Sequence, residues 1–430
     1  MVRVGLTGGI ACGKSHVRLK LAKEGIETLD LDEVAHTITA QGGEGYDEVI
    51  EAFGPRIVDG EGRLDRKALG AIVFADPSAR ALLNAIVHPK VREAEARWAA
   101  GAAGPLVVSE GALLVEAGVH LRFDRLVVVH CSPEEQLRRL QARDRLDLAS
   151  ARARLASQMP IEEKRRFAHF EVDASGTKLD MDRAVEALVR ALEAEASATP
   201  PRYDIPPSRA LGGLVHGPAA GPGGLDPLVV LAEIASAGGL EMGRIASRLI
   251  PPPAGPWYQA APRLDSGPGP ESLALPLVLW ALTRGAPDPP FLAAAAASLA
   301  RLTHREPAAI ATAVFFALAL QETAVGGGLP KDLPDRVGAW RSLAGRWSLG
   351  SPAAWLEDVL EVALRQPSNP QAARAALGGG GPRADLVGAL VGLAVGVPAE
   401  EAPPPLREAL DRLSRIRNPE GSALPGAPPS

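Results

Sequence analysis

Cysteine is scarce in this sequence of 430 residues. Cys12 and Cys131 are too few for a disulfide framework and fit a reducing compartment. An excess of one charge is also missing, because a formal net charge of -5 disfavours general binding of nucleic acid. Apolar runs such as residues 291–300 are too short to span a bilayer, and the first residues lack the pattern of a signal peptide. We therefore expect a soluble, cytoplasmic protein with neither a nucleic-acid nor a membrane partner.

Length and a change in composition predict more than one domain. Single cores seldom grow beyond about 250 to 300 residues. β-branched runs alternate with charged amphipathic stretches over the first 200 residues, whereas the remainder is rich in Ala, Leu, Gly and Pro. Four prolines at positions 200, 201, 206 and 207 predict an extended connector. The predicted organisation is an α/β domain over 1–199, a mainly helical domain over 200–417 and a disordered tail over 418–430.

The first 200 residues alternate strands and helices, which is typical of a parallel sheet covered on both faces. Strands are expected over residues 3–6, 26–29, 106–109, 125–130 and 170–173. Helices are expected over residues 14–23, 46–53, 66–73, 78–98, 133–144 and 149–159. Such folds bind ligands at the carboxyl ends of their strands, so the functional motifs should gather there.

The stretch TGGIACGKS, residues 7–15, has the Walker A spacing G-x-x-x-x-G-K-S, filled by Gly8, Gly13, Lys14 and Ser15. Glycines let backbone N–H groups approach phosphates, the lysine supplies positive charge to the β and γ groups, and the serine hydroxyl ligates Mg²⁺. A glycine-rich turn with an incidental Lys-Ser pair is the alternative. The motif follows a predicted strand and precedes a predicted helix, as phosphate binding requires, so it predicts a nucleoside triphosphate site.

Two carboxylates, Asp30 and Asp32, lie at the end of the second predicted strand within LDLDEVAH. A carboxylate there can face the phosphate loop and accept a proton from an acceptor hydroxyl, or hold a water of the Mg²⁺ shell. For Asp30, capping of a following helix is an equal alternative. For Asp32 the functional role is favoured.

An ordered series of motifs resembles the dephospho-coenzyme A kinase family from residue 2 to about residue 175. The series runs TGGIACGKS, LDLDEVAH, FGPRIVDGEGRLDRKALGAIVF, AIVHP, EGALLVE, QLRRLQARD and QMPIEEKRRFA. The resemblance implies an α/β P-loop kinase with a lid and an acceptor subdomain. It also implies ATP-dependent phosphorylation of the ribose 3′-hydroxyl of dephospho-CoA, with ATP and Mg²⁺ as cofactors and CoA and ADP as products.

The same resemblance implies roles for single residues. The catalytic residues would be Lys14, Asp32 and Arg139. The nucleotide would be bound by Gly8, Ala11, Cys12, Gly13, Lys14, Ser15, His16 and Arg143, with Ser15 as the metal ligand. The acceptor would be bound by Asp32, Arg66, His88 and Glu116. For His88, a structural role of the His-Pro pair at a helix junction is an alternative. For Glu116, a structural role is likewise an alternative.

A basic stretch over residues 138–166 predicts an arginine-bearing lid that screens charge on the transferred group. Arg139 and Arg143 are the expected phosphate or adenine contacts. The alternative is a solvated helical face with ion pairs three or four positions apart, which accounts for several of these side chains. Two departures from the family pattern are His16 in place of Thr and Ala174 in place of Asn, which concern an α-phosphate and an adenine contact.

The second half resembles the ADP-ribosylglycohydrolase family, an all-helical fold with a binuclear Mg²⁺ site. Three segments carry this resemblance, within residues 209–240, 299–320 and 384–400, and glycines at 212, 213, 217, 388, 392 and 396 have spacings that let helices approach closely. The metal-binding segments are degraded, however. One keeps Asp226, and the other keeps Asp385 but has Arg383 where a ligand belongs. We therefore expect a relative without metal, in which these groups form a salt bridge.

Two hypotheses follow for the whole chain. The first is a dephospho-CoA kinase with an appended, non-catalytic helical domain, whose residual ADP-ribosyl hydrolase activity is a minor alternative. The second is a regulatory protein that senses nucleotides or CoA metabolites without turnover. The sequence leaves the oligomeric state and the ligand of the second half open.

Overall fold

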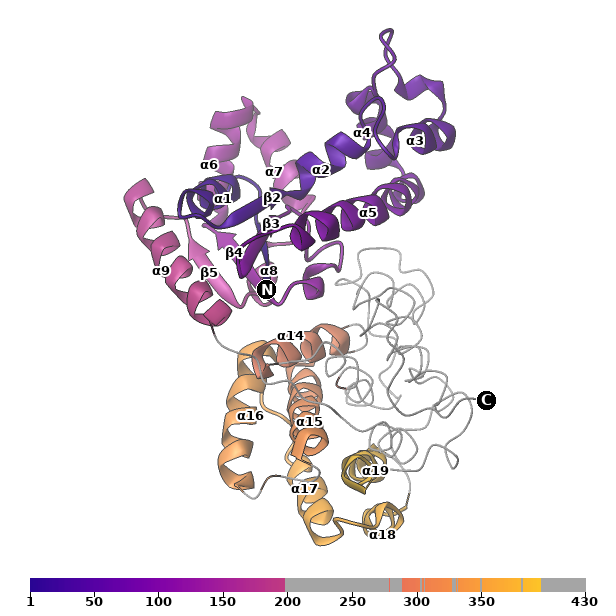
Figure 1. Ribbon diagram of the computed structural model, residues 1–430, viewed down its shortest axis with the longest axis vertical. Coiled ribbons are helices and arrows are strands. Elements are labelled where there is room, and N and C mark those ends of the chain that lie inside the picture. The colour runs from indigo at the N-terminus through magenta and orange to yellow at the C-terminus, as the bar shows by residue number, and fades with distance from the viewer. Residues whose placement is uncertain are drawn as a thin grey trace. The chain divides into compact units, whose positions relative to one another are not determined.

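The computed structural model describes residues 1–197, 278, 288–301, 304, 306–326, 330, 332–348, 350–379 and 382–395. The chain divides into two compact units, drawn in Figure 1. The first unit comprises Met1–Leu114 and Phe123–Ala198, and the second comprises Val115–Arg122 and Thr199–Ser430. The predicted domain bounds, 1–199 and 200–417, stay a prediction, and the short segment Val115–Arg122 groups with the second unit.

The first unit is built on a five-stranded parallel sheet in the order β2-β3-β1-β4-β5. The strands are β1 (Val2–Gly8), β2 (Glu27–Asp30), β3 (Leu106–Glu110), β4 (Arg125–His130) and β5 (Phe170–Asp173). All five strands predicted from the sequence are confirmed. Because β1 is central, the loop that follows it opens at the middle of the carboxyl edge of the sheet.

Nine α-helices of the first unit accompany the sheet: α1 (Lys14–Lys23), α2 (Leu31–Ile38), α3 (Tyr46–Phe53), α4 (Arg66–Ala75), α5 (Pro77–Ala100), α6 (Pro133–Asp144), α7 (Leu148–Ala156), α8 (Ile161–Arg165) and α9 (Lys178–Ser197). The six predicted helices are confirmed within a few residues. Helices α2, α8 and α9 were missed. The first two are short and span eight and five residues.

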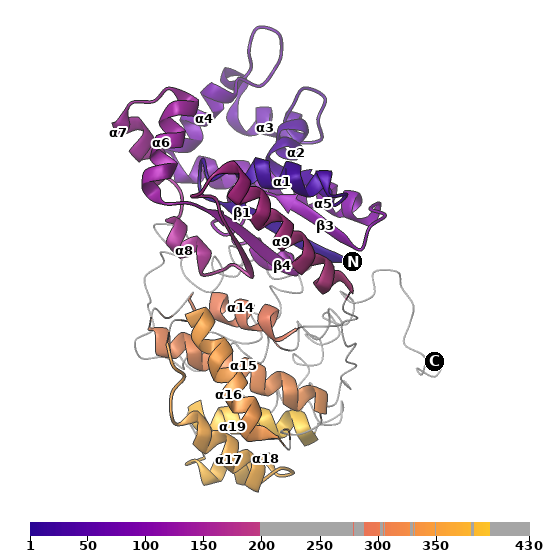
Figure 2. The same ribbon diagram turned by 90° about the vertical axis from the view of Figure 1, so that its left-hand side faces the viewer.

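The main core lies between the sheet and the helices α1 and α9, and Figure 2 shows α9 running across the strands. Val4 and Leu6 of β1 pack there with Val17 of α1 and Val185 of α9, all four with no exposed surface. Helix α5 covers the opposite face, where the Ser109 hydroxyl donates a hydrogen bond to Glu95 over 2.9 Å. Both faces of the sheet are thus covered, as the alternating pattern predicts.

Helices α2 to α5 form a smaller subdomain between β2 and β3. Its core gathers Val49, Phe53, Ile57, Leu69 and Val87. Asp65 caps α4 and Asp76 caps α5 through hydrogen bonds from backbone N–H groups, which explains where these helices begin. The subdomain has its own apolar core and follows directly after the acidic residues of β2, where the resemblance places the acceptor.

The described part of the second unit is helical. Its helices are α14 (Pro289–Ala300), α15 (Pro307–Gly326), α16 (Leu333–Ser348), α17 (Leu356–Arg365), α18 (Pro370–Ala376) and α19 (Pro382–Val395). Helix α15 packs against α14, α16 and α19, and Phe315 meets Trp340 edge to face at 5.5 Å. The window Pro307–Val325 is long and apolar enough to cross a membrane, but 78% of it is buried inside the protein, as in a core helix.

The predicted glycines of the second half fall partly within this description. Gly388 and Gly392 are buried on α19, which packs against α15, α17 and α18. The glycines at 212, 213, 217 and 396, the connector and the predicted tail lie outside the described residues.

Candidate active site at the carboxyl edge of the sheet

The loop at residues 9–13 turns from β1 into α1 and has a backbone that demands glycine. Gly13 has a φ of +93°, a left-handed conformation that side chains rarely adopt. At Gly9, a Cβ atom would lie 2.0 Å from Nε2 of Gln136. Gly13 caps α1 without any side-chain hydrogen bond to the first turn, so that turn presents its backbone N–H groups and the positive end of the helix dipole to an anion.

Two glutamines hold this loop in place. The Gln136 side chain donates hydrogen bonds to the Ile10 carbonyl oxygen over 3.0 Å and to Cys12 Sγ over 3.1 Å. The backbone N–H of Ile10 donates to Oε1 of Gln158 over 3.0 Å. The glutamines lie 126 and 148 positions along the chain from Ile10. Sequence reasoning missed both, because no local pattern connects them with the loop.

Cys12 is buried within the loop beside Cys131, the residue after β4. The two Sγ atoms lie 3.5 Å apart, and both thiols are free. The hydrogen bond from Cys131 is the main cause that lowers the pKa of Cys12 to about 7, against the opposing effect of burial. Lys14 contributes to the same shift. Cys12 thus fills the interior of the loop.

Lys14 lies over the loop with its ammonium group among backbone carbonyls. Its Nζ atom donates to the Gly9 oxygen over 3.1 Å and to the Gly8 oxygen over 3.4 Å. Burial lowers the pKa of Lys14 from its ordinary value, and the charge of Lys164 lowers it further. A phosphate group would counter both effects by supplying negative charge.

Glu110, the last residue of β3, lies next to the predicted metal ligand. Ser15 Oγ donates to Glu110 Oε1 over 3.1 Å, and Arg18 Nε donates to Oε2 over 2.7 Å. Only 4% of Glu110 is exposed. Sequence analysis quoted this residue within EGALLVE but gave it no role. A carboxylate at the end of an apolar strand was the available signal, the same one that identified Asp30 and Asp32.

Asp30 and Asp32 differ in role. The Asp30 side chain accepts hydrogen bonds from the N–H groups of Asp32 and Glu33, over 3.0 and 3.2 Å, and so caps α2. Its other oxygen lies 3.5 Å from Arg18 Nη2. The capping alternative for Asp30 is therefore confirmed.

Asp32 lies on the first turn of α2 and keeps part of its surface in contact with solvent. The protein atoms around its carboxyl group raise its pKa above the ordinary Asp value, and the charge of Asp30 raises it further. Lys14 and a hydrogen bond from the backbone N–H of Ala112 act in the opposite direction. Lys14 and Asp32 are therefore electrostatically coupled.

The predicted acceptor residues lie in different parts of the structure. Arg66 begins α4, and its Nη2 atom donates to the His36 carbonyl oxygen over 2.9 Å and to Thr39 Oγ1 over 3.2 Å. His88 is exposed and precedes Pro89 in the interior of α5. The expectation that this pair lies at a junction between helices is therefore wrong. Glu116 belongs to the segment that groups with the second unit. Acceptor binding by these residues stays a prediction.

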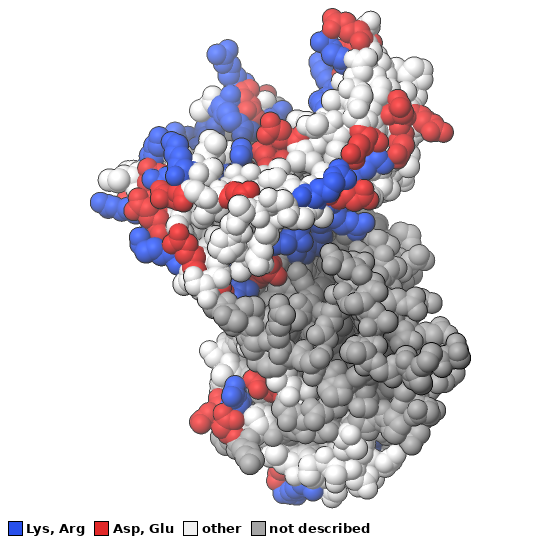
Figure 3. Space-filling model, viewed as in Figure 1, with Lys and Arg blue, Asp and Glu red and all other residues white. Residues whose placement is uncertain are grey.

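The lid arginines form ion pairs on their own helices. Arg139 Nε donates to Glu135 over 2.6 Å and its Nη2 to the Ala174 carbonyl oxygen over 2.7 Å. Arg143 pairs with Asp144 over 2.7 Å. Figure 3 shows that charges of both signs are interspersed over this unit. The ion-pair alternative is thus confirmed, and contacts of these arginines with a nucleotide stay predictions.

The two departures from the family pattern also have partners. His16 Nε2 lies 2.9 Å from Asp182 Oδ1 on α9. Ala174 is fully buried in the main core, and its N–H donates to the His130 carbonyl oxygen over 2.7 Å. Both positions are therefore engaged within the protein, and their effects on nucleotide contacts stay predictions.

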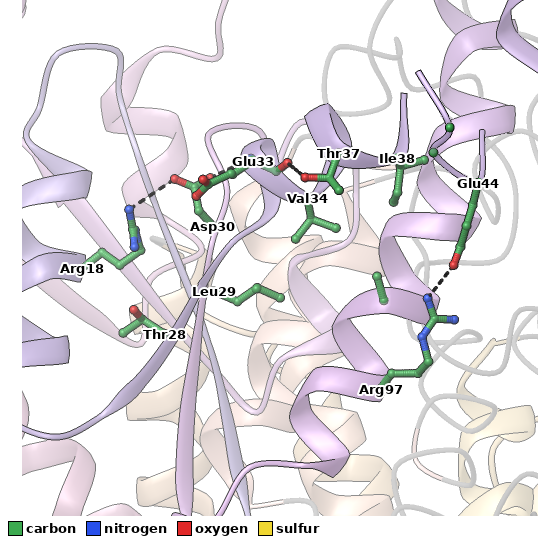
Figure 4. Close-up of a pocket in the computed structure, with 13 residues that line it drawn as sticks. Arg18, Thr28, Leu29, Asp30, Glu33, Val34, Thr37, Ile38, Glu44 and Arg97 are labelled. Atoms are coloured by element: carbon green, nitrogen blue, oxygen red, sulfur yellow. Dashed lines mark hydrogen bonds and ion pairs between the residues drawn. The ribbon is translucent and has the colours of Figure 1, made fainter. Parts of the chain in front are cut away.

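A cavity of about 530 Å³ lies beside β2 and α2. Figure 4 shows Arg18 reaching Asp30 on one side of it and Arg97 reaching Glu44 on the other. Neither Lys14 nor Asp32 lines this cavity. It is a neighbour of the phosphate site and does not contain the groups suited to phosphoryl transfer.

In the second unit, the surviving carboxylate of the degraded metal motif is engaged. Asp385 lies 2.8 Å from Arg374 Nη1, while Arg383 reaches Asp358 at 3.7 Å and stacks over Trp355 at 5.4 Å. Asp385 thus forms a salt bridge, but with Arg374 and not with the Arg383 of its own motif. Asp226 lies outside the described residues.

The parallel sheet, the glycine loop with Lys14 and the carboxylates beside it define a P-loop kinase. The sequence model of the dephospho-CoA kinase family matches residues 2–180, and that of the ADP-ribosylglycohydrolase family matches residues 242–416. The chain belongs to the dephospho-CoA kinase family and carries an ADP-ribosylglycohydrolase-like domain after the kinase.

The chain matches its curated relatives over nearly the whole length of those relatives. The dephospho-CoA kinase of Geobacter sulfurreducens is 43% identical over 188 residues, which cover 43% of this chain and 95% of the relative. That of Geobacillus kaustophilus is 38% identical, over 44% of this chain and 96% of its own. A solved dephospho-CoA kinase from Campylobacter jejuni is 27% identical, covers 45% of this chain and 98% of its own, and has a TM-score of 0.35.

The raised pKa of Asp32 predicts a stability effect of Asp32→Asn. A carboxyl group whose pKa is higher in the folded state binds its proton more tightly there, so folding is opposed once the pH rises above the unfolded-state pKa of about 3.9. The neutral Asn removes this opposition. We expect a higher thermal midpoint at pH 7, with the gain shrinking towards pH 4, and no comparable gain in the neighbouring control Glu33→Gln. An equal gain at both pH values would contradict the assignment.

Proposed function

We propose that the first unit transfers the γ-phosphoryl group of ATP to the ribose 3′-hydroxyl of dephospho-CoA, giving CoA and ADP. The observation that supports this most is the convergence of Lys14, Ser15 and Asp32 at the carboxyl edge of the sheet, in a chain 43% identical to a curated dephospho-CoA kinase. The loop and α1 would hold the ATP phosphates. The helical subdomain after β2 would hold the acceptor.

Lys14 would stabilise negative charge on the transferred group. Phosphoryl transfer depends mainly on positioning and on compensation of charge spread over the phosphoryl oxygens. The Lys14 ammonium group now donates to two carbonyl oxygens and can turn one of its hydrogen atoms to a phosphate. Arg139 and Arg143 would add charge from the lid, at the expense of their present ion pairs with Glu135 and Asp144.

Ser15 and Glu110 provide a fitting environment for Mg²⁺. Magnesium prefers oxygen ligands and is usually held by one or two protein groups together with substrate phosphates and waters. The Ser15 hydroxyl and the buried Glu110 carboxylate lie 3.1 Å apart at the mouth of the loop. Ser15 would ligate the ion, and Glu110 would orient Ser15 or a water in its shell. When bound, the ion supplies charge neutralisation at the phosphates.

Asp32 would accept the proton of the 3′-hydroxyl. A raised pKa makes its carboxylate a better base than an ordinary Asp, and partial exposure leaves it within reach of a substrate. Lys14 and the Ala112 N–H act against this rise and lower the pKa of Asp32. The proton and the phosphoryl group would therefore be handled by two side chains that influence each other electrostatically.

The second unit would be a non-catalytic partner of the kinase. A binuclear Mg²⁺ site needs several oxygen ligands, whereas Asp385 is already neutralised by Arg374. Arg383 adds a second cation beside the degraded motif. This arrangement favours a structural or ligand-binding role for the helical domain.

Turnover should depend on Lys14 and Asp32. In an assay that couples ADP release to dephospho-CoA, we expect Lys14→Ala to lower kcat by about 10² to 10³-fold, and Asp32→Asn by about 10² to 10⁴-fold. Lys20→Ala, on the same helix and outside the loop, is the matched control and should retain wild-type kcat. Turnover that survives both substitutions would refute the mechanism. A wild-type protein that binds ATP without phosphorylating dephospho-CoA would instead favour the sensor hypothesis.

The proposed metal role of Glu110 predicts a changed Mg²⁺ requirement. Glu110→Gln keeps the shape and removes the charge, so half-maximal rate should need about tenfold more Mg²⁺, in line with losses seen when supporting groups of metal sites are replaced. Rates are measured across a Mg²⁺ titration at saturating ATP, with Glu33→Gln as the control. An unchanged titration curve in the folded Glu110→Gln protein would exclude this role.

Hydrolysis of ADP-ribosyl substrates should be undetectable. The full chain carrying Lys14→Ala, which removes kinase turnover, is incubated at stoichiometric concentration with an ADP-ribosylated peptide and Mg²⁺. We expect no release of ADP-ribose, because Asp385 is held by Arg374. Release that Asp385→Ala abolishes would overturn the non-catalytic assignment.

A further inference from the structure

Lys164 of α8 is a fully buried cation at the junction of the two halves of the site. It has no exposed surface, and its Nζ atom donates to the Ala112 carbonyl oxygen over 3.1 Å and to the Gly8 carbonyl oxygen over 3.4 Å. Its helix packs against β4, as Figure 2 shows. Removing an ammonium group from water is costly, so such a residue persists where the surrounding polar groups compensate it.

At Gly8, Lys164 shares its acceptor with the phosphate-binding lysine. The Gly8 carbonyl oxygen accepts from Lys14 Nζ and from Lys164 Nζ, each over 3.4 Å. Gly8 is the last residue of β1 and the first glycine of the Walker motif. Lys164 therefore holds the same backbone carbonyl group that Lys14 contacts.

At Ala112, Lys164 contacts the residue that holds the proposed base. The Ala112 carbonyl oxygen accepts from Lys164 Nζ and from Thr7 Oγ1, the latter over 3.2 Å. The backbone N–H of the same residue acts on the Asp32 carboxylate, where it lowers the pKa of that group. Ala112 follows β3 in a loop, where no strand pairing fixes its carbonyl group. Lys164 and Thr7 thus determine where the Ala112 N–H points.

We propose that Lys164 is a positioning residue for phosphoryl transfer, which fixes Asp32 relative to Lys14 by joining the backbone at Ala112 to the backbone at Gly8. The inference rests on the proposed function, because it takes Lys14 and Asp32 as the groups that must be aligned. Lys164 itself acts through these two residues. It donates to two backbone oxygen atoms and so fixes their positions, and its charge also lowers the pKa of Lys14.

The experiment replaces Lys164 by Met in the full chain. Met keeps the length of the side chain and removes the ammonium group, so the variant retains its packing while losing both hydrogen bonds. We expect kcat to fall by about 10²-fold, the scale on which a 1 Å misplacement acts. Lys164→Arg, which keeps a donor cation, should lose less. Arg190→Met, an exposed arginine of α9 that lies outside the basic stretch, is the control and should keep wild-type kcat.

A double-mutant cycle separates positioning from general damage to the fold. If Lys164 acts by aligning Asp32, Lys164→Met should cost less than about threefold in kcat in the Asp32→Asn protein, because the aligned group is already gone. An equal 10²-fold loss in both backgrounds would overturn the proposal, as would wild-type kcat in a folded Lys164→Met protein. Circular dichroism and thermal unfolding establish that each variant is folded.

The outcome is distinguishable from failure of the proposed function. Absence of turnover in the wild-type protein would refute the kinase assignment whatever Lys164 does. In that case calorimetric titration with ADP tests whether Lys164 helps to position Lys14, since this measurement needs no turnover. We expect Lys164→Met to weaken ADP binding several-fold relative to Arg190→Met, and equal affinities would overturn the proposal.

Discussion

The central place of β1 in the sheet is the constraint on which the active site depends. Parallel strands end at one edge, and the register pairs Leu6 of β1 with Glu110 of β3, and Glu110 with Asp30 of β2. The phosphate loop, the buried carboxylate and the capping aspartate therefore emerge side by side. Any strand order that separated β1 from β3 would move Glu110 away from Ser15 and remove the surroundings proposed for the metal ion.

Around that edge, the protein holds several charges with little access to water. Lys14 and Lys164 contact one carbonyl oxygen, while Glu110 is matched by Arg18. Burial disfavours the charged forms of both Lys14 and Asp32, and a neighbouring like charge adds to the effect at each. The pKa of Lys14 is therefore lowered and the pKa of Asp32 is raised. A site built in this way favours a bound polyanion with its cation, because each relieves part of the electrostatic cost. In the proposed mechanism, binding of ATP and activation of the acceptor would thus be linked physically.

The chain joins this kinase to a helical unit that has a separate core. The charged groups of that unit are arranged differently. Helix α15 lies among α14, α16 and α19 and is almost wholly apolar. Where a metal-dependent relative would gather carboxylates, this unit pairs Asp385 with Arg374. The fusion therefore combines two units that differ in their charged groups. The first gathers buried charged groups at one edge of its sheet, and the second pairs its remaining motif carboxylate with an arginine.

The sequence by itself determined the features that are local in the chain. The Walker loop, the five strands and most helices depend on neighbouring residues and on short periodicities, so they could be predicted without a structure. The segments of α2, α8 and α9 were not predicted as helices. The family assignment also followed from the order of the motifs, although a role for Glu110 did not.

Only the tertiary structure decided which distant residues complete the site. Gln136, Gln158 and Lys164 contact the phosphate loop or the end of β1 from segments more than a hundred positions away, and the motifs that contain them give no sign of these contacts. Folding also chose between alternatives that composition left open, making Asp30 a helix cap and pairing Arg139 and Arg143 with carboxylates. The physical reason is that hydrogen bonds and ion pairs depend on distances of a few ångströms, which sequence separation does not specify.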